Sequence, residues 1–220
     1  EILAEVETLN LIVKCYKKLG FKNIKIQIND RKLVDSIIEN LKISEANQKD
    51  VFICLDKTDK IGLKAACELM IERGISQEIA DKLFKVFNIQ GSNKEILNHL
   101  EAFNTTTLSS IIDYADKLGF EENLNINLGV VRGLDYYTGL VFEVVDEQIK
   151  IGSFGGGGRY ENLCERFTHE KISGIGYSFG IERVMIAMQD LKLDTQTQEN
   201  KILIVALDPN YRLNAVSLNN

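Results

Sequence analysis

The chain has 220 residues, of which 45% are hydrophobic and 26% charged, an ordinary composition for a globular protein with a sizeable core. Its formal net charge of -6 argues against a protein that coats nucleic acid non-specifically, although a local basic patch can still contact RNA. No apolar run approaches the length of a membrane span, and no N-terminal segment resembles a signal peptide. The chain opens on Glu1 inside a helical pattern, so we expect a piece of a longer protein.

Residues 1–19 repeat apolar positions at helical spacing and are followed by Gly20, which predicts an amphipathic helix packed on a core. Residues 23–29 alternate between apolar and polar, which predicts a strand with one buried side. Ser44 is expected to open a turn of helix, and Ser76 is expected to be an N-cap. Further helices are expected at 31–41, 60–73, 76–86, 93–101 and 107–118.

From residue 123 the apolar period changes to two, which predicts an antiparallel meander. Residues 140–145 are apolar on both faces and predict a central strand. The expected strands are 125–132, 140–145, 148–154 and 172–179, and the expected helices are 160–167 and 181–193. The last helix is expected to turn inward Val184, Met185, Ala187 and Met188. Together these elements predict an α+β fold: an antiparallel sheet with flanking helices, interrupted by a helical insertion.

The cysteines and histidines indicate the redox compartment of the protein and whether it binds a metal through these residues. The cysteines are Cys15, Cys54, Cys67 and Cys164. They include no Cys-x-x-Cys pair, which favours free thiols in a reducing cytosol over disulfides or zinc. His99 and His169 stand far apart among polar neighbours and are interpreted as solvated surface. We therefore expect a cytoplasmic protein whose cysteines and histidines hold no metal.

Three stretches place arginine and glycine beside aromatic residues on predicted strands or strand ends. They read VRGLDYYTG at 131–139, GGGGRY at 155–160 and GIGYSFGIER at 174–183. Glycine is rare inside strands unless another backbone or a ligand must come close. The guanidinium fork of arginine suits a carboxylate or a phosphate. The stretches therefore predict the floor of a pocket for a small charged ligand.

These stretches carry a resemblance to the histidyl-tRNA synthetases. Residues 132–138 resemble the first signature of that family, and residues 157–163 resemble the second, with Glu161 where the family usually has aspartate. Residues 174–183 are similar to motif 3 of class II aminoacyl-tRNA synthetases, and Ile-Asn-Asp-Arg at 28–31 resembles the core strand of the archaeal and eukaryotic branch. Motifs 1 and 2 of the class, which supply the dimer interface and a second ATP arginine, are absent from the chain.

The resemblance implies a layout and an activity. The implied parts are a class II catalytic core at 1–33 and 123–193, a helical insertion domain at 34–122, a linker at 194–200 and the beginning of an α/β anticodon-binding domain at 201–220. The implied activity is histidine–tRNA ligation: activation of L-histidine with ATP and Mg²⁺, then transfer to tRNA(His), by a homodimer without a membrane. Lacking motifs 1 and 2, the chain is expected to carry half a site and to be poorly active alone.

The resemblance also implies roles for individual residues in the activation of histidine. The attacking carboxylate is already ionised, so activation needs alignment and charge neutralisation at the α-phosphorus rather than a general base. The resemblance implies Arg132 and Arg183 as catalytic residues. Arg132 would bridge the histidine carboxylate and the α-phosphate, and Arg183 would lie with Gly180 over ATP near a helix N-terminus. The implied histidine-binding residues are Arg132, Tyr136, Tyr137, Gly157, Gly158 and Tyr160. Glu143 and Glu182 are candidate magnesium ligands.

Plainer interpretations stand beside each assignment. The arginines could form structural salt bridges, the tyrosines could pack in a core, the glycines could mark a β-bulge, and the insertion could be a stabilising module. The lysines near residue 60 could be a phosphate-facing patch or a solvated helix face. Three other functions also remain open. They are the regulatory subunit of ATP phosphoribosyltransferase, the synthetase-like module of a stress kinase and an unrelated mononucleotide-binding protein.

Overall fold

The computed structural model describes residues 2–131, 137–149, 151–161, 172–193 and 208. The described part begins with helix α1 (Ile2–Lys18), strand β1 (Ile24–Asp30) and helix α2 (Arg31–Asn40). Next come α3 (Glu45–Leu55), α4 (Thr58–Ile61), α5 (Leu63–Glu72), α6 (Gln77–Phe87), α7 (Asn93–His99) and α8 (Thr106–Lys117). A short 3-10 helix, η1 (Glu121–Asn123), leads into β2 (Leu124–Ile126), β3 (Leu140–Asp146), β4 (Gly155–Tyr160), β5 (Gly174–Phe179) and α9 (Ile181–Asp190).

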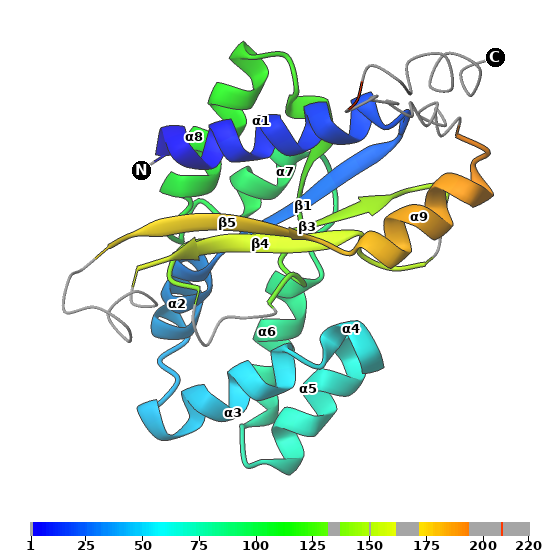
Figure 1. The fold of residues 1–220 in the computed structure, drawn as a ribbon. Helices are drawn as coiled ribbons and strands as arrows, with labels where there is room; N and C mark the ends of the chain where they lie inside the picture. Colours follow the sequence, from blue (N-terminus) through cyan, green and yellow to red (C-terminus); the bar gives the residue numbers. More distant parts are fainter. Residues whose placement is uncertain (1, 132–136, 150, 162–171, 194–207, 209–220) are drawn as a thin grey trace.

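The described strands form one sheet in the order β2-β1-β3-β4-β5 (Figure 1). β3 is its central strand, as its apolar residues on both faces predicted. The predicted α+β fold with flanking helices and a helical insertion is confirmed, with one correction. β1 pairs with β3 in antiparallel fashion but with β2 in parallel, so the sheet is mixed. The insertion explains this, because a long helical crossover returns the chain to the same end of the sheet.

Helix α1 covers one face of the sheet and contacts β1, β5 and α8 (Figure 1). Its buried side chains are Glu5, Val6, Leu9, Ile12, Val13 and Tyr16, which confirms the predicted amphipathic helix. The facing side of β1 is equally apolar, with Ile24, Ile26 and Ile28 each no more than 2% exposed. The main core therefore lies between α1, α8 and this face of the sheet.

Helices α3 to α6 form a group that stands apart from the sheet in Figure 1 and whose contacts are chiefly with one another. Helices α2, α7 and α8 instead contact β1 or β2. The helices between β1 and β2 thus include both a layer on the sheet and a group that projects from it. The boundaries predicted for the insertion, 34–122, stay a prediction.

The helix ends test the cap predictions. The Ser76 hydroxyl accepts a hydrogen bond from the backbone amide of Ile79 at 3.3 Å, which confirms the predicted N-cap of α6. Ser44 precedes α3, but its side chain makes no cap hydrogen bond, and α3 is a full helix rather than a single turn. The helix predicted at 60–73 is divided at Gly62, whose φ of 82° lies in the left-handed region that glycine tolerates.

The strand predicted at 148–154 is wrong. The Asp146 carboxylate accepts from the backbone amide of Gln148 at 2.8 Å, so the chain turns there. Pairing resumes only at Gly155, and the strand is Gly155–Tyr160. Backbone groups alone form its ladder, and glycines carry no side-chain alternation, so the apolar period pointed to the wrong residues.

Other predicted bounds also shift. The strand predicted at 125–132 ends at Ile126, after which the Asn127 side chain accepts from the amide of Gly129 at 2.9 Å and turns the chain. Tyr160 belongs to β4, so the helix predicted at 160–167 does not begin there, and its residues from 162 lie outside the described part. Met185, predicted to face inward, is 56% exposed, whereas Val184 and Ala187 are buried. The predicted linker and the predicted second domain lie outside the described residues, apart from Asp208.

Candidate substrate-binding site

An open cavity of about 690 Å³ lies where β3, β4 and β5 meet the start of α9. Its lining comes from Val130, Tyr137, Val141, Phe142, Glu143, Ser153, Gly155, Gly156, Gly157, Ser178, Phe179, Gly180, Ile181, Glu182 and Arg183. The stretches at 131–139, 155–160 and 174–183, far apart in sequence, each contribute at least one lining residue. The structure therefore confirms that they meet, as the glycine and arginine pattern predicted.

A row of polar positions crosses the floor of this cavity. Glu143 pairs in register with Gln27 on one side and with Gly156 on the other, and Gly156 pairs with Ser178. Side chains at directly paired positions point to the same face of a sheet. Their chain neighbours Phe142 and Tyr177 point to the other face, where Tyr177 reaches α1. The cavity therefore lies on the face opposite α1.

The glycines of β4 are explained mostly by the rings that lie against them. The Phe142 ring and the backbone carbonyl of Gly176 occupy the place where a Cβ at Gly157 would lie. The Tyr177 ring occupies the same place at Gly155, and the Tyr137 ring occupies it at Gly158. Packing by neighbouring residues is therefore sufficient to explain why these three positions are glycine.

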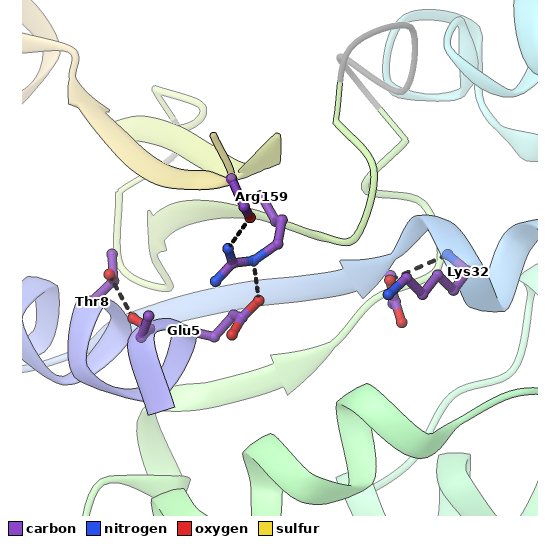
Figure 2. Close-up of polar contacts among 7 residues, drawn as sticks. Glu5, Thr8, Lys32 and Arg159 are labelled. Atoms are coloured by element: carbon purple, nitrogen blue, oxygen red, sulfur yellow. Dashed lines mark hydrogen bonds and ion pairs between the residues drawn. The ribbon is translucent and has the colours of Figure 1, made fainter. Parts of the chain in front are cut away.

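Arg159, the arginine of the second stretch, is buried and bound by the protein itself. Figure 2 shows its side chain reaching from β4 toward Glu5 of α1, where Nε donates to the Glu5 carboxylate at 2.5 Å. One terminal nitrogen donates to the Ser173 hydroxyl at 2.7 Å. Both side chains of the ion pair are at most 6% exposed. The carboxylate that this guanidinium holds is therefore Glu5, and Arg159 lies on the α1 side of the sheet, away from the cavity.

A second acid lies in the same buried layer. Asp30 caps α2 by accepting from the backbone amide of Lys32 at 3.2 Å, a contact drawn in Figure 2. Burial raises the pKa of Asp30, and the charge of Glu5 raises it further, while a hydrogen bond from Thr107 opposes the rise. One carboxylate oxygen of Asp30 and one of Glu5 have no hydrogen-bond partner among the described residues. Two acids, Glu5 and Asp30, thus influence each other electrostatically in this buried layer.

Two tyrosines tie α1 to β5 beneath the cavity. The hydroxyls of Tyr16 and Tyr177 lie 2.7 Å apart, and the Tyr177 ring stacks on Phe142 with the ring centres 6.0 Å apart. Burial raises the pKa of both tyrosines, so both hydroxyls stay protonated near neutral pH. The Phe142 and Tyr177 rings lie against Gly157 and Gly155, so this contact joins α1 to the underside of the cavity floor.

Arg183 lies at one end of the cavity and is exposed. Its guanidinium donates to the backbone carbonyl of Ser153 at 2.8 Å, which anchors it beside the loop that precedes β4. It belongs to the first turn of α9, where Gly180 makes no side-chain cap and the first backbone amides have no partner within the helix. An exposed guanidinium beside such amides is suited to a phosphate group.

The Ile-Asn-Asp-Arg stretch at 28–31 also gains a physical role. The Asn29 amide donates to the carbonyls of Leu128 and Val130, at 3.2 and 3.1 Å, from a fully buried position. The backbone amide of Arg31 donates to the carbonyl of Gly139 at 2.9 Å. These contacts hold both flanks of residues 132–136. Asn29, which the sequence had only matched by resemblance, therefore fixes the described residues that lead into the first signature.

The structure brings some of the predicted site residues together. Tyr137, Gly157, Gly180 and Arg183 line the cavity. Tyr160 and Gly158 do not line it: the Tyr160 ring lies across Gly174 on β5. Arg132 and Tyr136 lie outside the described residues, so their roles stay predictions. Ser178 and Ser153 were missed, while Gly156 belongs to the predicted glycine stretch but had been given no role of its own. The alternation of β5 could have shown that Ser178 shares a face with Glu143.

The described part of the chain has neither a cluster of metal-binding side chains nor a membrane-spanning helix. Within the described residues, no three histidine, cysteine or acidic side chains gather in a way that could hold a metal ion. Among the described helices, none is long and apolar enough to cross a membrane. Cys15, Cys54 and Cys67 are free thiols, while Cys164 and His169 lie outside the described residues.

The fold is that of class II synthetases. The crystal structure of histidyl-tRNA synthetase from Nostoc sp. PCC 7120 aligns with a TM-score of 0.80 at 25% identity, over 99% of this chain and 54% of that one. An ATP phosphoribosyltransferase regulatory subunit/histidyl-tRNA synthetase from Bacillus halodurans aligns with a TM-score of 0.72 at 20% identity, over 85% of this chain and 50% of that one. The second likeness shows the fold alone.

The family model for histidyl-tRNA synthetase matches residues 1–184, and the chain belongs to that family. A histidine–tRNA ligase from Phocaeicola vulgatus is 36% identical over 202 residues, which cover 87% of this chain and 44% of that protein. One from Christiangramia forsetii is 35% identical over 219 residues, 91% of this chain and 47% of that protein. The chain thus spans about half the length of the curated relatives it matches. The archaeal and eukaryotic branch suggested by residues 28–31 stays a prediction.

Proposed function

We propose that the protein is a histidine–tRNA ligase, which activates L-histidine with ATP and transfers the histidyl group to tRNA(His). Membership of the family supports this, and so do relatives whose names state that activity. The observation that carries the proposal is the cavity itself. It has an aromatic hydroxyl side chain, Tyr137, in its lining, an arginine at a helix N-terminus, Arg183, and a glycine floor between them. That arrangement suits an amino acid joined to a nucleotide phosphate.

The residue roles form part of the proposal. Arg132 bridges the histidine carboxylate and the α-phosphate, and Arg183 with Gly180 binds ATP. Among the residues expected to bind histidine, Tyr137 and Gly157 line the cavity and Arg132 and Tyr136 lie outside the described residues, so the proposal keeps these four. Gly158 and Tyr160, which do not line the cavity, are not part of it. A site that hydrogen-bonds an imidazole excludes ligands without those nitrogens more strongly than an apolar pocket could. Because the carboxylate is already ionised, the protein's contribution is alignment and neutralisation of charge.

ATP brings magnesium, and the cavity lining fits that ion. Glu143 and Glu182 both line the cavity, and carboxylate oxygens are the ligands that Mg²⁺ prefers. Bound magnesium would neutralise charge on the phosphates. Glu143, in register between Gln27 and Gly156, would hold it from the floor, and Glu182 from the first turn of α9.

The layout of the whole protein is also proposed rather than observed. Residues 1–33 and 123–193 form the catalytic core, 34–122 an insertion domain that approaches the tRNA acceptor arm, 194–200 a linker and 201–220 the beginning of an anticodon-binding domain. The protein acts as a cytoplasmic homodimer. The helices α3 to α6, which pack chiefly on one another, support a separate insertion.

Histidine-dependent exchange of pyrophosphate into ATP tests the function on the protein as its gene encodes it. We expect exchange with histidine and none with other amino acids. Arg132→Ala should lower the single-turnover rate of adenylate formation by about a hundredfold to a thousandfold, since one donor aimed at the developing charge is lost. Tyr137→Phe should instead weaken discrimination for histidine. Absence of exchange with histidine would contradict the proposal and favour a regulatory subunit of the same fold.

A further inference from the structure

The segment that leads into β4 holds Arg183 at two points. The Ser153 carbonyl accepts a hydrogen bond from the Arg183 guanidinium at 2.8 Å. The carbonyl of the next residue, Phe154, accepts from the backbone amide of Gly180 at 2.7 Å, at the residue that precedes α9. Two successive carbonyls therefore hold this arginine, one by its side chain and the other through the start of its helix.

The core fixes these carbonyls in place. The Phe154 side chain is fully buried, and the centre of its ring lies 5.5 Å from that of Phe21. Its backbone amide donates to the Val144 carbonyl of β3 at 2.6 Å. Because Phe154 is held by its ring and by both of its backbone polar groups, the adjoining Ser153 carbonyl has little freedom to move. The acceptor that Arg183 meets is thus part of the rigid framework.

Gly152 determines how the chain enters this segment. Its φ of 84° lies in the left-handed region, which glycine adopts freely and alanine does not. A Cβ at Gly152 would lie 3.5 Å from the same terminal nitrogen of Arg183 that donates to Ser153. That is an ordinary van der Waals distance, so space alone does not require glycine. The backbone conformation requires it, and this conformation brings Ser153 alongside the guanidinium.

The direction of the guanidinium decides what it can bind. Arg183 is exposed in the cavity, beside first-turn amides of α9 that have no partner within the helix. The N–H donors of an arginine lie in one fixed plane, so a carbonyl that holds one nitrogen also sets the direction of the others. A side chain ordered in advance loses less freedom when a ligand binds. The Ser153 contact therefore preorganises Arg183 for an anionic ligand.

We propose that Gly152 is a positioning residue for ATP that acts through Arg183: its left-handed backbone places the Ser153 carbonyl where it orients the guanidinium toward the phosphates. The proposal rests on the proposed function and adds a residue outside the three glycine-rich stretches of the sequence. Gly152 is not among the residues that line the cavity, so its effect on ATP passes through the residue that it positions. If the glycine only closed the turn between β3 and β4, its substitution would change stability and leave the affinity for ATP alone.

The test is a double-mutant cycle on Gly152→Ala and Arg183→Met in the protein as its gene encodes it, with the dissociation constant for ATP measured by calorimetry. Alone, Gly152→Ala should bind ATP about three- to tenfold more weakly, up to the whole contribution of Arg183, because a misplaced donor loses most of its value. In the Arg183→Met background it should change the dissociation constant by less than about twofold, since the group through which it acts is gone.

Gly74→Ala is the matched control. Gly74 also has a positive φ, 92°, and among the described residues a Cβ there would meet nothing within 4 Å. It follows α5 and does not line the cavity. The two substitutions therefore impose similar backbone strain at different places. We expect both variants to lose stability to a similar degree in thermal unfolding, whereas Gly74→Ala should bind ATP as the wild type does.

Ser153→Ala decides the matter if Gly152→Ala does not fold. It keeps the accepting carbonyl but removes the hydroxyl, which donates to the Gly155 carbonyl at 2.7 Å and so braces this part of the backbone. We expect a smaller version of the same result, with ATP bound about two- to threefold more weakly when Arg183 is present and no change in the Arg183→Met background. An effect that persists without Arg183 would instead mean that the Ser153 hydroxyl contacts ATP directly.

Two results would overturn the inference. One is wild-type affinity for ATP in a folded Gly152→Ala. The other is an equal loss of affinity with and without Arg183, for Gly152→Ala or, in its place, Ser153→Ala. Failure of the proposed function is distinguishable from both. A wild type that binds ATP but shows no histidine-dependent exchange would contradict that function, while the cycle still decides the role of Gly152. A wild type that does not bind ATP would contradict both.

Discussion

The two faces of β4 are built for different purposes. On the α1 side, Gly155 and Gly157 lie under aromatic rings, and Arg159 is sealed in an ion pair with Glu5. On the cavity side, Gly156 lies in register between Glu143 and Ser178, and among the described residues a Cβ there would meet the Phe142 carbonyl oxygen alone, at 3.3 Å. Successive residues of one six-residue strand therefore alternate between holding the fold together and facing the ligand space.

The two arginines make the same point. Arg159 and Arg183 both stand in glycine-rich stretches, and the sequence predicts an anion for each. Arg159 is 5% exposed and its anion is Glu5 of the same chain, whereas Arg183 is exposed at the cavity and donates to the Ser153 carbonyl. An arginine in a motif thus indicates an anion nearby. Whether that anion is a ligand follows only from the burial of the arginine side chain and from the group that it contacts.

Removing the buried ion pair on the α1 side should have the largest effect on stability. Arg159→Met would leave the Glu5 carboxylate buried without its ion partner, which costs about 3–5 kcal/mol of unfolding free energy. The double variant Glu5→Leu with Arg159→Met should recover most of that loss, because the stranded charge is gone. Urea unfolding of the single and double variants measures both. Equal stability of wild type and Arg159→Met would show that the pair is not structural.

Adding one methyl group to the α1 side comes next. Gly157→Ala would place a Cβ against the Gly176 carbonyl and the Phe142 ring, and overpacking of this kind costs about 1–3 kcal/mol. Gly156→Ala, its neighbour on the other face, is the control and should cost less, because its Cβ would lie 3.3 Å from the Phe142 carbonyl oxygen and, among the described residues, against no ring. Thermal unfolding compares the two. A Gly157→Ala protein as stable as Gly156→Ala would mean that the faces do not differ.

The tyrosine contact should matter less. Tyr177→Phe removes one hydroxyl of the buried pair, which is worth about 1 kcal/mol for a typical hydrogen bond. Tyr16 keeps a weak alternative acceptor, the Phe154 carbonyl at 3.5 Å, so the loss should stay near that value. Chemical unfolding at neutral pH measures the loss. No change in stability would show that the two hydroxyls do not depend on each other.

The smallest effect concerns pH. Burial raises the pKa of Asp30 in the folded protein above its ordinary value of 3.8. A raised folded pKa means that the protonated group contributes stability at low pH, and that this contribution is lost as pH rises through the raised value. Asp30→Asn does not ionise and can still cap α2. Its unfolding free energy should therefore fall less than that of the wild type between mildly acidic and neutral pH. Parallel profiles would contradict the assignment.

The sequence predicted those elements whose side chains carry a period. α1, β1, α6 and α9 follow from apolar spacing, with bounds within a few residues. β4 was missed because consecutive glycines carry no pattern, and the turn after Asp146 shifted the strand toward the C-terminus. The parallel pairing of β1 and β2 depends on where a long crossover ends, which local spacing does not contain.

For the site, the sequence identified several motif residues that line the cavity, but it did not predict which residues those side chains contact. Tyr137, Gly180 and Arg183 line one cavity, as the stretches predicted. The partner of Arg159 lies 154 residues away in sequence, so no local pattern could have separated this arginine from a ligand-binding one.

The most direct test of the contrast between the two faces is a crossed measurement on Arg159→Met and Arg183→Met. Unfolding free energy and the dissociation constant for ATP are measured for both variants in the protein as its gene encodes it. Arg183→Met should keep its stability within about 0.5 kcal/mol, as exposed substitutions usually do. It should bind ATP about tenfold or more weakly, because a charge-assisted hydrogen bond is lost. Arg159→Met should lose stability and, under conditions where it remains folded, bind ATP as the wild type does. If Arg183→Met instead lost stability and kept its affinity for ATP, Arg183 would be the structural arginine and the account of the cavity would be wrong.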